Sequence, residues 1–143
     1  AAKNLTNDFL LLNGDTFVDI NLKEFYSFHL NKKSMWTMSL HSLEESTRYA
    51  NIEIDENNVV ISLKTDIVQF NTLINAGAYI VNPSALDRFN SSIGKEVSIE
   101  NEILPSLIFS KDGVYGMQFS GRFIDIGIPS DYYNAENILH QCP

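Results

Sequence analysis

The sequence contains one cysteine, few prolines and no apolar run long enough to cross a membrane. The single thiol, Cys142, excludes an internal disulfide. The longest aliphatic and aromatic runs, such as residues 9–12, are far shorter than the roughly 20 apolar residues of a membrane helix. No basic segment followed by an apolar one resembles a signal peptide at the start. These absences predict a cytoplasmic protein with no membrane partner.

Basic residues are also scarce, since ten Lys and Arg stand against eighteen Asp and Glu and give a net charge of -8. This charge repels nucleic acid at long range and excludes a polynucleotide-binding role. It also opposes a nucleoside triphosphate. Nucleotide chemistry on this chain therefore requires a divalent cation or a local basic loop.

The length of 143 residues and the hydrophobic content of 44% fit one globular unit spanning residues 1–143. We find no internal repeat, low-complexity tract or Gly/Ser linker that would indicate a second domain. The order of predicted strands and helices favours a single mixed α/β layer structure.

The first third of the sequence predicts a strand, a helix and a second strand. Phe9–Leu12 is an apolar run that ends at Asn13-Gly14, a pattern typical of a central parallel strand buried on both faces. Asn21, with Glu24 three positions later, predicts the start of a helix that ends near residues 31–33. Residues 35–40 then predict a strand related to the first by a parallel crossover.

The remaining elements follow from turn signals and periodicity. Residues 52–54 and 59–63 flank a polar turn and predict an antiparallel hairpin at the sheet edge, and residues 73–81 predict a further strand. Pro105 interrupts an apolar helical stripe at 99–108, which predicts two short helices or a kink. Strands are expected at 114–119 and 122–126, followed by a helix that begins near Pro129.

Two acidic residues follow apolar strands, where ligands bind in open α/β sheets. Asp15 comes after the first strand, beside Gly14, which leaves room for a phosphate to approach the backbone, and Asp125 leaves the strand at 122–126. Two carboxylates at one edge repel each other unless a divalent cation lies between them. Mg²⁺ commonly takes one or two protein carboxylates and leaves its other positions to water and phosphates.

Each of these residues could also have a purely structural role. Asp15 and Asp125 are each compatible with a turn or helix-capping role, and Asp19 and Asp131 with solvated or capping positions. His29 is expected to pack on the apolar face of the first helix. We assign no chemistry to His41 or His140, because neither belongs to a triad or zinc pattern.

Four segments together resemble the sugar-1-phosphate nucleotidyltransferases in both order and spacing: residues 12–16 (LNGDT), 74–79 (INAGAY), 98–100 (SIE) and 123–132 (FIDIGIPSDY). The likeness extends over nearly the whole chain. It is strongest to the bacterial guanylyltransferases that act on D-glycero-D-manno-heptose 1-phosphate or mannose 1-phosphate. The resemblance implies a Rossmann-like (GT-A type) mixed sheet flanked by helices, and a role in nucleotide-sugar synthesis for polysaccharide or lipopolysaccharide.

The resemblance also implies roles for individual residues. Asp15 and Asp125 would be the catalytic Mg²⁺ ligands, Gly14 would admit the substrate, and Asn75, Gly77 and Glu100 would line the sugar-phosphate pocket. In that family the sugar phosphate attacks the α-phosphorus of a nucleoside triphosphate, here GTP by likeness, and expels pyrophosphate without a covalent enzyme intermediate.

Two departures from the family pattern stand out. The family places a Glu-Lys pair after the hairpin, where this chain has Thr65-Asp66, so Lys64 is the nearest substitute for the missing cation. The family's glycine-rich, Arg-containing loop and the Lys after it should precede Asp15 by many residues, but only fourteen residues precede it here. We therefore expect a C-terminal portion that lacks the N-terminal strand-loop-helix units and does not catalyse transfer alone.

Three functions are compatible with these observations. The first is part of an active guanylyltransferase, either a fragment or one half of a split enzyme that another chain completes. Self-association or a completing chain is expected, because the loss of central strands would expose apolar edges. The second is a non-catalytic relative that binds sugar phosphates or nucleotide sugars. The third is a metal-dependent glycosyltransferase on the same sheet architecture, which the absence of an Asp-x-Asp pair disfavours.

Overall fold

The computed structural model of the chain describes residues 5–46, 49–64, 69–92, 96–111 and 113–139. A six-stranded sheet follows the order β5-β4-β6-β3-β7, with β1 also paired to β6, and β2 and β8 form a separate two-stranded ladder. The strands are β1 (Phe9–Leu12), β2 (Thr16–Val18), β3 (Trp36–Ser46), β4 (Asn51–Ile54), β5 (Val60–Lys64), β6 (Gln69–Val81), β7 (Val114–Phe119) and β8 (Phe123–Asp125).

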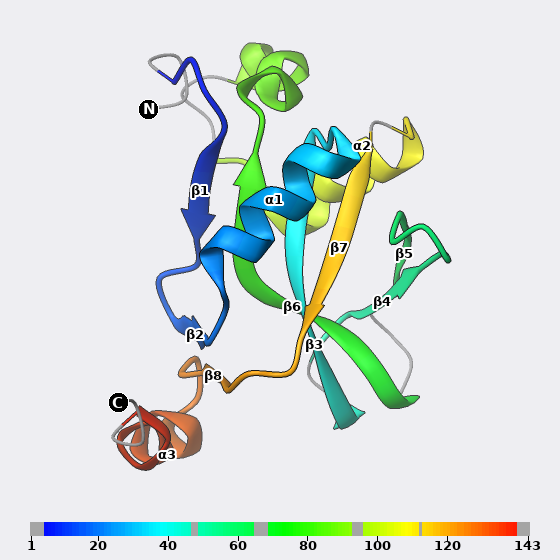
Figure 1. Ribbon diagram of the computed structural model, residues 1–143. Coiled ribbons are helices and arrows are strands. Elements are labelled where there is room, and N and C mark those ends of the chain that lie inside the picture. Colours follow the sequence, from blue (N-terminus) through cyan, green and yellow to red (C-terminus); the bar gives the residue numbers. More distant parts are fainter. Residues whose placement is uncertain (1–4, 47–48, 65–68, 93–95, 112, 140–143) are drawn as a thin grey trace.

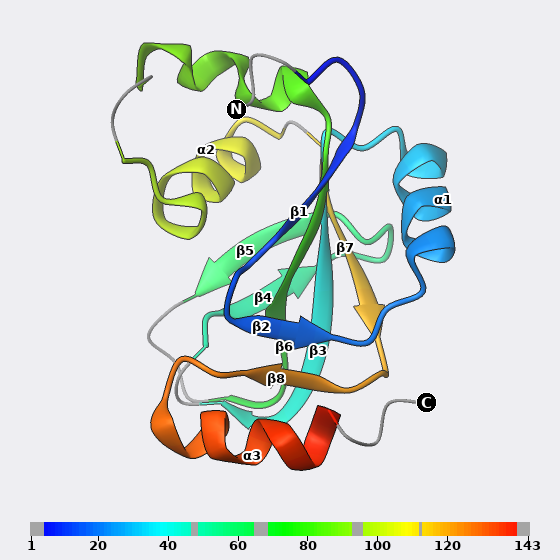
Figure 2. The same cartoon turned by 90° about the vertical axis from the view of Figure 1, so that its left-hand side faces the viewer.

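Helices lie on both faces of the main sheet (Figures 1 and 2). They are α1 (Leu22–Lys32), the 3₁₀ helix η2 (Pro83–Ser92), the π-helical turn η3 (Ile99–Ile103), α2 (Leu104–Phe109) and α3 (Pro129–Leu139). Figure 2 shows α1 on one face and η2 with α2 on the other, while the β2–β8 ladder and α3 close one end. The predicted α/β architecture, a mixed sheet flanked by helices, is confirmed, because β3–β7 is parallel and the other pairings are antiparallel.

Two apolar clusters fill the spaces between the sheet and its helices. The larger one packs α2 against the sheet and is built around Trp36, Met38, Leu40, Tyr79, Leu104 and Leu107. The smaller one packs α1 against the opposite face through Phe25, Ala78, Ile80 and Phe119. The ring of Phe25 meets the ring of Phe119 edge-on at 5.4 Å. Alternate residues of β6 therefore contribute to different clusters.

The predicted start and end of α1 are confirmed. Asn21 Oδ1 accepts hydrogen bonds from the backbone N–H groups of Lys23 and Glu24, and its amide donates to Glu24 Oε1 at 2.9 Å. This cap satisfies N–H groups that have no partner inside the helix. The helix ends at Lys33, which adopts a left-handed conformation with φ 50°.

The hairpin of β4 and β5 is confirmed at the edge of the sheet. Its turn is held by Asp55, whose Oδ1 accepts from the backbone N–H groups of Asn57 and Val59. The turn is also tied to the rest of the molecule, because Lys32 Nζ donates to the Asn57 carbonyl at 2.7 Å.

The prediction of a central parallel strand at Phe9–Leu12 is wrong in two respects. Its one strand partner in the described residues, β6, runs antiparallel to it, although β1 and β3, each antiparallel to β6, are parallel to each other as the predicted crossover requires. Leu10 and Leu12 are 43% and 58% exposed, on the sheet face that carries α1. The uninterrupted apolar run suggested burial on both faces, but within the described residues β6 is the only strand beside β1.

The later elements agree with the sequence, with two additions. η3 and α2 are the two short helices expected around Pro105, and α3 begins at Pro129 as predicted. The sequence analysis missed β2 and η2. None of the helices in the described part of the chain has both the length and the apolar character that crossing a bilayer requires.

Candidate functional site

The β2–β8 ladder brings the two predicted metal ligands together. Thr16 pairs with Asp125, and the backbone N–H of Ile126 donates to the Asp15 carbonyl at 2.9 Å. Asp15 is exposed and Asp125 is half-buried. One oxygen of Asp125 accepts the backbone N–H of Gly127 at 2.7 Å, which fixes this carboxylate where the strand ends. The two acids, 110 positions apart in sequence, thus lie at neighbouring positions on paired strands.

This pair suits a cation that needs few protein ligands. Over the described ranges there is no group of three or more His, Cys, Asp or Glu side chains arranged to hold a metal ion. Two carboxylates, one exposed and one half-buried, have the chemistry that Mg²⁺ prefers, because this ion takes one or two protein carboxylates and retains several positions for water and phosphate oxygens.

β6 has a bulge that contacts the segment around Asp15. Met38 pairs with Tyr79 and Leu40 with Asn75, so the β6 residues between them, centred on Gly77, oppose the single residue Ser39. The Ser39 hydroxyl accepts the backbone N–H of Ala78 at 3.1 Å and replaces a bond of the ladder. Bulges of this kind often re-aim side chains next to active sites.

Gly77 allows the bulge to touch the loop that holds Asp15. Its φ is +78°, which favours glycine, and a Cβ at this position would overlap the hydroxyl of Thr16. The Gly77 carbonyl accepts the backbone N–H of Asn13 at 2.8 Å. In contrast, a Cβ at Gly14 would meet no atom within 4 Å, so the approach to the backbone at Gly14 is open.

Asn75 connects the bulge to a helical turn on the other side of the site. Its Nδ2 donates to Glu100 Oε1 at 2.8 Å and to the hydroxyl of Tyr79, while its Oδ1 accepts the backbone N–H of Gly77 at 3.1 Å. Glu100 lies in the first turn of η3, which Ser98 caps by accepting from the backbone N–H of Asn101. The structure thus joins Asn75, Gly77 and Glu100 by hydrogen bonds, while their role in a sugar-phosphate pocket stays a prediction.

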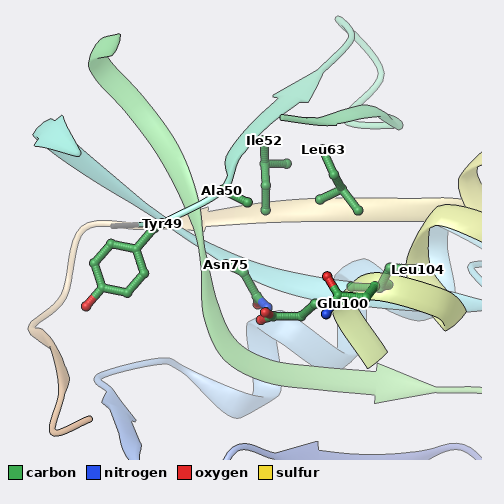
Figure 3. A pocket seen from close by; sticks show the side chains of 8 residues that line it. Tyr49, Ala50, Ile52, Leu63, Asn75, Glu100 and Leu104 are labelled. Carbon is green, nitrogen blue, oxygen red and sulfur yellow. The ribbon is translucent and has the colours of Figure 1, made fainter. Parts of the chain in front are cut away.

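A cavity of about 120 Å³ opens beside Asn75 and Glu100. Figure 3 shows the polar ends of Asn75 and Glu100 together, with the apolar side chains of Ile52 and Leu63 above them. Its lining consists of Tyr49, Ala50, Ile52, Leu63, Asn75, Glu100, Asn101 and Leu104. A mostly apolar cavity with a few convergent polar groups is typical of a small-molecule site.

Comparisons with known proteins identify the family of this chain. The family model described as "Nucleotidyl transferase" matches residues 1–141. The chain belongs to the nucleotidyl transferase family. It is 34% identical over 125 residues to the mannose-1-phosphate guanylyltransferase catalytic subunit beta of Drosophila melanogaster, covering 87% of this chain and 33% of that protein. It is 30% identical over 132 residues to the D-glycero-alpha-D-manno-heptose 1-phosphate guanylyltransferase of Campylobacter jejuni, covering 92% and 56%.

Solved structures of the family share the fold. The crystal structure of HddC from Yersinia pseudotuberculosis superimposes with a TM-score of 0.79 at 28% identity, over 94% of this chain and 56% of HddC. A second HddC structure, complexed with GMP-PN, gives a TM-score of 0.76 at 29% identity, over 90% of this chain and 54% of that one. The chain spans between a third and about three fifths of the length of the curated relatives reported for it.

Lys64 does not join the other predicted substrate-binding residues. Its Nζ forms an ion pair with Glu53 Oε1 at 2.6 Å. Leu63 lines the cavity, and successive residues of a strand point to opposite faces, so Lys64 lies on the face away from the cavity. Thr65 and Asp66, which replace the family's Glu-Lys pair, lie outside the described residues.

Two of the remaining polar candidates have structural roles. His29 is buried as predicted, with Nδ1 2.8 Å from Thr37 Oγ1 and Nε2 3.4 Å from Asp8 Oδ2. Burial lowers the pKa of His29 despite the nearby Asp8 carboxylate. Asp19, expected to be solvated or capping, is 52% exposed and pairs with Arg122 at 3.3 Å.

The other candidates carry no chemistry that the structure reveals. Asp131 lies in the first turn of α3, where the helix dipole stabilises a negatively charged side chain. The ring of His41 stacks on Phe123 at 5.3 Å, and burial lowers its pKa. His140 and Cys142 lie outside the described residues.

Sequence reasoning missed three contributors to the site, namely Thr16, Ser39 and Tyr79. The residues 16–18 (TFV) favour a strand by their β-branched and aromatic character, which was a signal for β2. Tyr79 was noted only as a strand residue, although its hydroxyl accepts from Asn75. The role of Ser39 depends on a bulge in a different strand and has no local signal.

Proposed function

We propose that this chain forms the metal-binding and sugar-phosphate-binding part of a sugar-1-phosphate guanylyltransferase. The observation that supports the proposal is the contact of the Gly77 bulge with the loop of Asp15, because Gly77 is also bonded to Asn75, which holds Glu100 at the cavity. In the reaction a sugar 1-phosphate attacks the α-phosphorus of GTP and releases pyrophosphate.

The two halves of the site have different tasks in this proposal. The Glu100 carboxylate, held by Asn75, accepts hydrogen bonds from sugar hydroxyls, and the apolar wall of Ile52, Leu63 and Leu104 packs against the carbon skeleton. Asp15 and Asp125 hold a Mg²⁺ ion, which when bound neutralises charge on the phosphates. The open backbone at Gly14 lets the phosphates approach this pair.

The choice of GTP and of sugar rests on relatives. The curated proteins are named for mannose 1-phosphate and for D-glycero-alpha-D-manno-heptose 1-phosphate, and one HddC structure is complexed with GMP-PN. The two curated names indicate guanylyl transfer to manno-configured sugar phosphates, and the HddC title names GMP-PN as the ligand. We assign this chain to the same reaction class, within nucleotide-sugar synthesis for polysaccharide or lipopolysaccharide.

Triphosphate binding requires a completing segment or chain. The net charge of -8 opposes an unaided triphosphate, and the sequence contains no glycine-rich loop beside Lys or Arg. The exposed Leu10 and Leu12 on β1, whose second edge has no strand partner within the described ranges, offer a place for an added strand. We therefore expect no transfer by this chain alone.

A metal titration tests the proposal. Mn²⁺, followed by its electron paramagnetic resonance signal, should bind the wild-type chain, and mannose 1-phosphate should raise the melting temperature more with Mg²⁺ than without. Asp15→Asn and Asp125→Asn should each abolish both effects. Asp19→Asn is the matched control, because Asp19 borders the same ladder but pairs with Arg122. Equal metal binding by all four proteins would reject the site.

The alternative is a non-catalytic relative that binds sugar phosphates or nucleotide sugars. It is favoured by one observation, the engagement of Lys64 with Glu53 on the face away from the cavity. The two functions separate when the N-terminal part of a related enzyme is added in trans with GTP, Mg²⁺ and mannose 1-phosphate. Pyrophosphate release that depends on Asp15 and Asp125 supports the enzyme, and binding without release supports the alternative.

A further inference from the structure

Tyr79 is a fully buried side chain whose only polar atom reaches the edge of the site. Its ring packs edge-on against Trp36 at 5.6 Å in the larger apolar cluster. Its hydroxyl accepts a hydrogen bond from Asn75 Nδ2. A residue that only filled the core would not need a hydroxyl here, because the rest of its surroundings is apolar.

The two N–H donors and the carbonyl oxygen of the Asn75 amide all bond to protein groups. An asparagine amide has two N–H donors and one carbonyl oxygen. The donors go to Tyr79 and Glu100, and the oxygen accepts from the backbone N–H of Gly77. The Glu100 carboxylate and the Gly77 N–H together determine which amide atom of Asn75 is the nitrogen and which is the oxygen. Asn75 therefore orients its neighbours, and one of them is the Glu100 carboxylate of the cavity lining.

The same contacts extend to the metal side of the site. Asn75 holds the N–H of Gly77, and the carbonyl of Gly77 accepts the N–H of Asn13 at 2.8 Å. Asn13 begins the short loop that carries Asp15. A displacement of the Asn75 amide would thus reach Glu100 on one side and the Asp15 loop on the other.

We propose that Tyr79 is a positioning residue for both halves of the site, acting through Asn75. The inference rests on the proposed function, because it assigns the cavity to a sugar phosphate and the Asp15–Asp125 pair to a metal. Burial raises the pKa of Tyr79 to about 12, so the hydroxyl remains protonated and uncharged throughout the neutral range.

The first test follows backbone amides by NMR and needs no ligand. Tyr79→Phe removes the hydroxyl and keeps the ring on Trp36, and it should shift the amide resonances of Gly77 and Asn13. Tyr115→Phe, on β7, is the matched control and should leave both in place. Unchanged Gly77 and Asn13 amides in a folded Tyr79→Phe protein would overturn the role of Tyr79.

The second test asks whether Tyr79 acts through Asn75. Tyr79→Phe should weaken the binding of mannose 1-phosphate about tenfold in the wild-type background, since it leaves a buried donor without its partner. In the Asn75→Ala background the same change should have almost no further effect, because the group it orients is gone. A full tenfold loss in both backgrounds would show a merely structural effect and contradict the proposal.

A third variant keeps the inference testable if Tyr79→Phe does not fold. Asn75→Ala alone should shift the amide resonances of Gly77 and Asn13, and unchanged resonances would contradict the proposed chain of contacts.

Failure of the proposed function would be recognised by a different result. In that case the wild-type chain binds neither Mn²⁺ nor mannose 1-phosphate, whereas the amide shifts still decide whether Tyr79 sets the positions of Gly77 and Asn13.

Discussion

Thr16 and Asp125 face each other as partners in the β2–β8 ladder, and the hydroxyl of Thr16 also occupies the space beside Gly77. One threonine therefore adjoins both the strand that carries a predicted metal ligand and the bulge whose Gly77 is bonded to Asn75 of the cavity lining. This arrangement makes the substitution of Gly77 informative.

Gly77→Ala should destabilise the protein by about 2–4 kcal/mol, because alanine is strained at positive φ and its methyl group would overlap Thr16. Urea denaturation measures the loss. Gly14→Ala is the matched control and should change stability by less than about 1 kcal/mol, since its Cβ would meet open space. Adding Thr16→Ala should recover part of the loss, and a double variant no more stable than Gly77→Ala would contradict this explanation.

Stability should fall when the pH is lowered from 7.5 to 5.5. Burial lowers the pKa of His29 below its usual value near 6.5, so the unfolded chain binds more protons than the folded one in this window. The contribution is present above pH 6.5 and is lost as the pH falls toward the folded-state pKa. Asp8 reduces the effect but does not reverse it.

The unfolding free energy at each pH, measured by urea titration, checks this prediction. His29→Gln should flatten the pH dependence, leaving the part that comes from His41, whose pKa burial also lowers. A pH slope identical in the wild-type and His29→Gln proteins would show that His29 does not contribute.

Lys64→Ala should leave the affinity for mannose 1-phosphate within about twofold of wild type, because Lys64 is paired with Glu53 and lies away from the cavity. Its effect on stability should be below about 1 kcal/mol, as is usual for exposed ion pairs. Glu100→Gln, within the cavity lining, should weaken binding at least fivefold by calorimetry. A larger loss for Lys64→Ala than for Glu100→Gln would restore Lys64 as a ligand residue.

Substitution on β1 tests the expected association. Leu10→Lys and Leu12→Lys together should reduce self-association measured by light scattering, because both side chains are exposed beside an unpaired strand edge within the described part of the chain. Ile61→Lys is the control, since Ile61 is 55% exposed on β5 at the other side of the sheet. A wild-type chain that is already a stable monomer of 16.2 kDa would rule out self-association.

The elements with local signals were predictable from the sequence. Asn21 and Glu24 mark the start of α1 because the cap is made by residues three positions apart. Asp55 similarly organises the β4–β5 turn through bonds to the next few residues. In both cases the physical cause lies within one turn of the chain, so a single sequence contains it.

The arrangement of the site was predictable only in part. The resemblance selected Asp15, Asp125, Asn75, Gly77 and Glu100; the structure pairs the segments of the two acids and hydrogen-bonds Asn75 to Gly77 and Glu100, while the roles of these residues stay predictions. The bulge at Gly77 and the place of Tyr79 depend on pairing between distant strands, which no local pattern encodes. The exposure of β1 also depends on which strands lie beside it, so composition alone gave the wrong answer there.

The small size of the β2–β8 ladder has a consequence for how the site responds to ions. Its strands are three residues each, whereas β3 and β6 pair along most of their length in the main sheet. Such a short ladder opens at lower free energy than the main sheet, and its amides exchange with solvent sooner. If a cation binds only when the ladder is closed, its apparent affinity is proportional to the fraction of molecules with a closed ladder. Changes that stabilise the ladder should therefore raise both the cation affinity and the protection of the ladder amides.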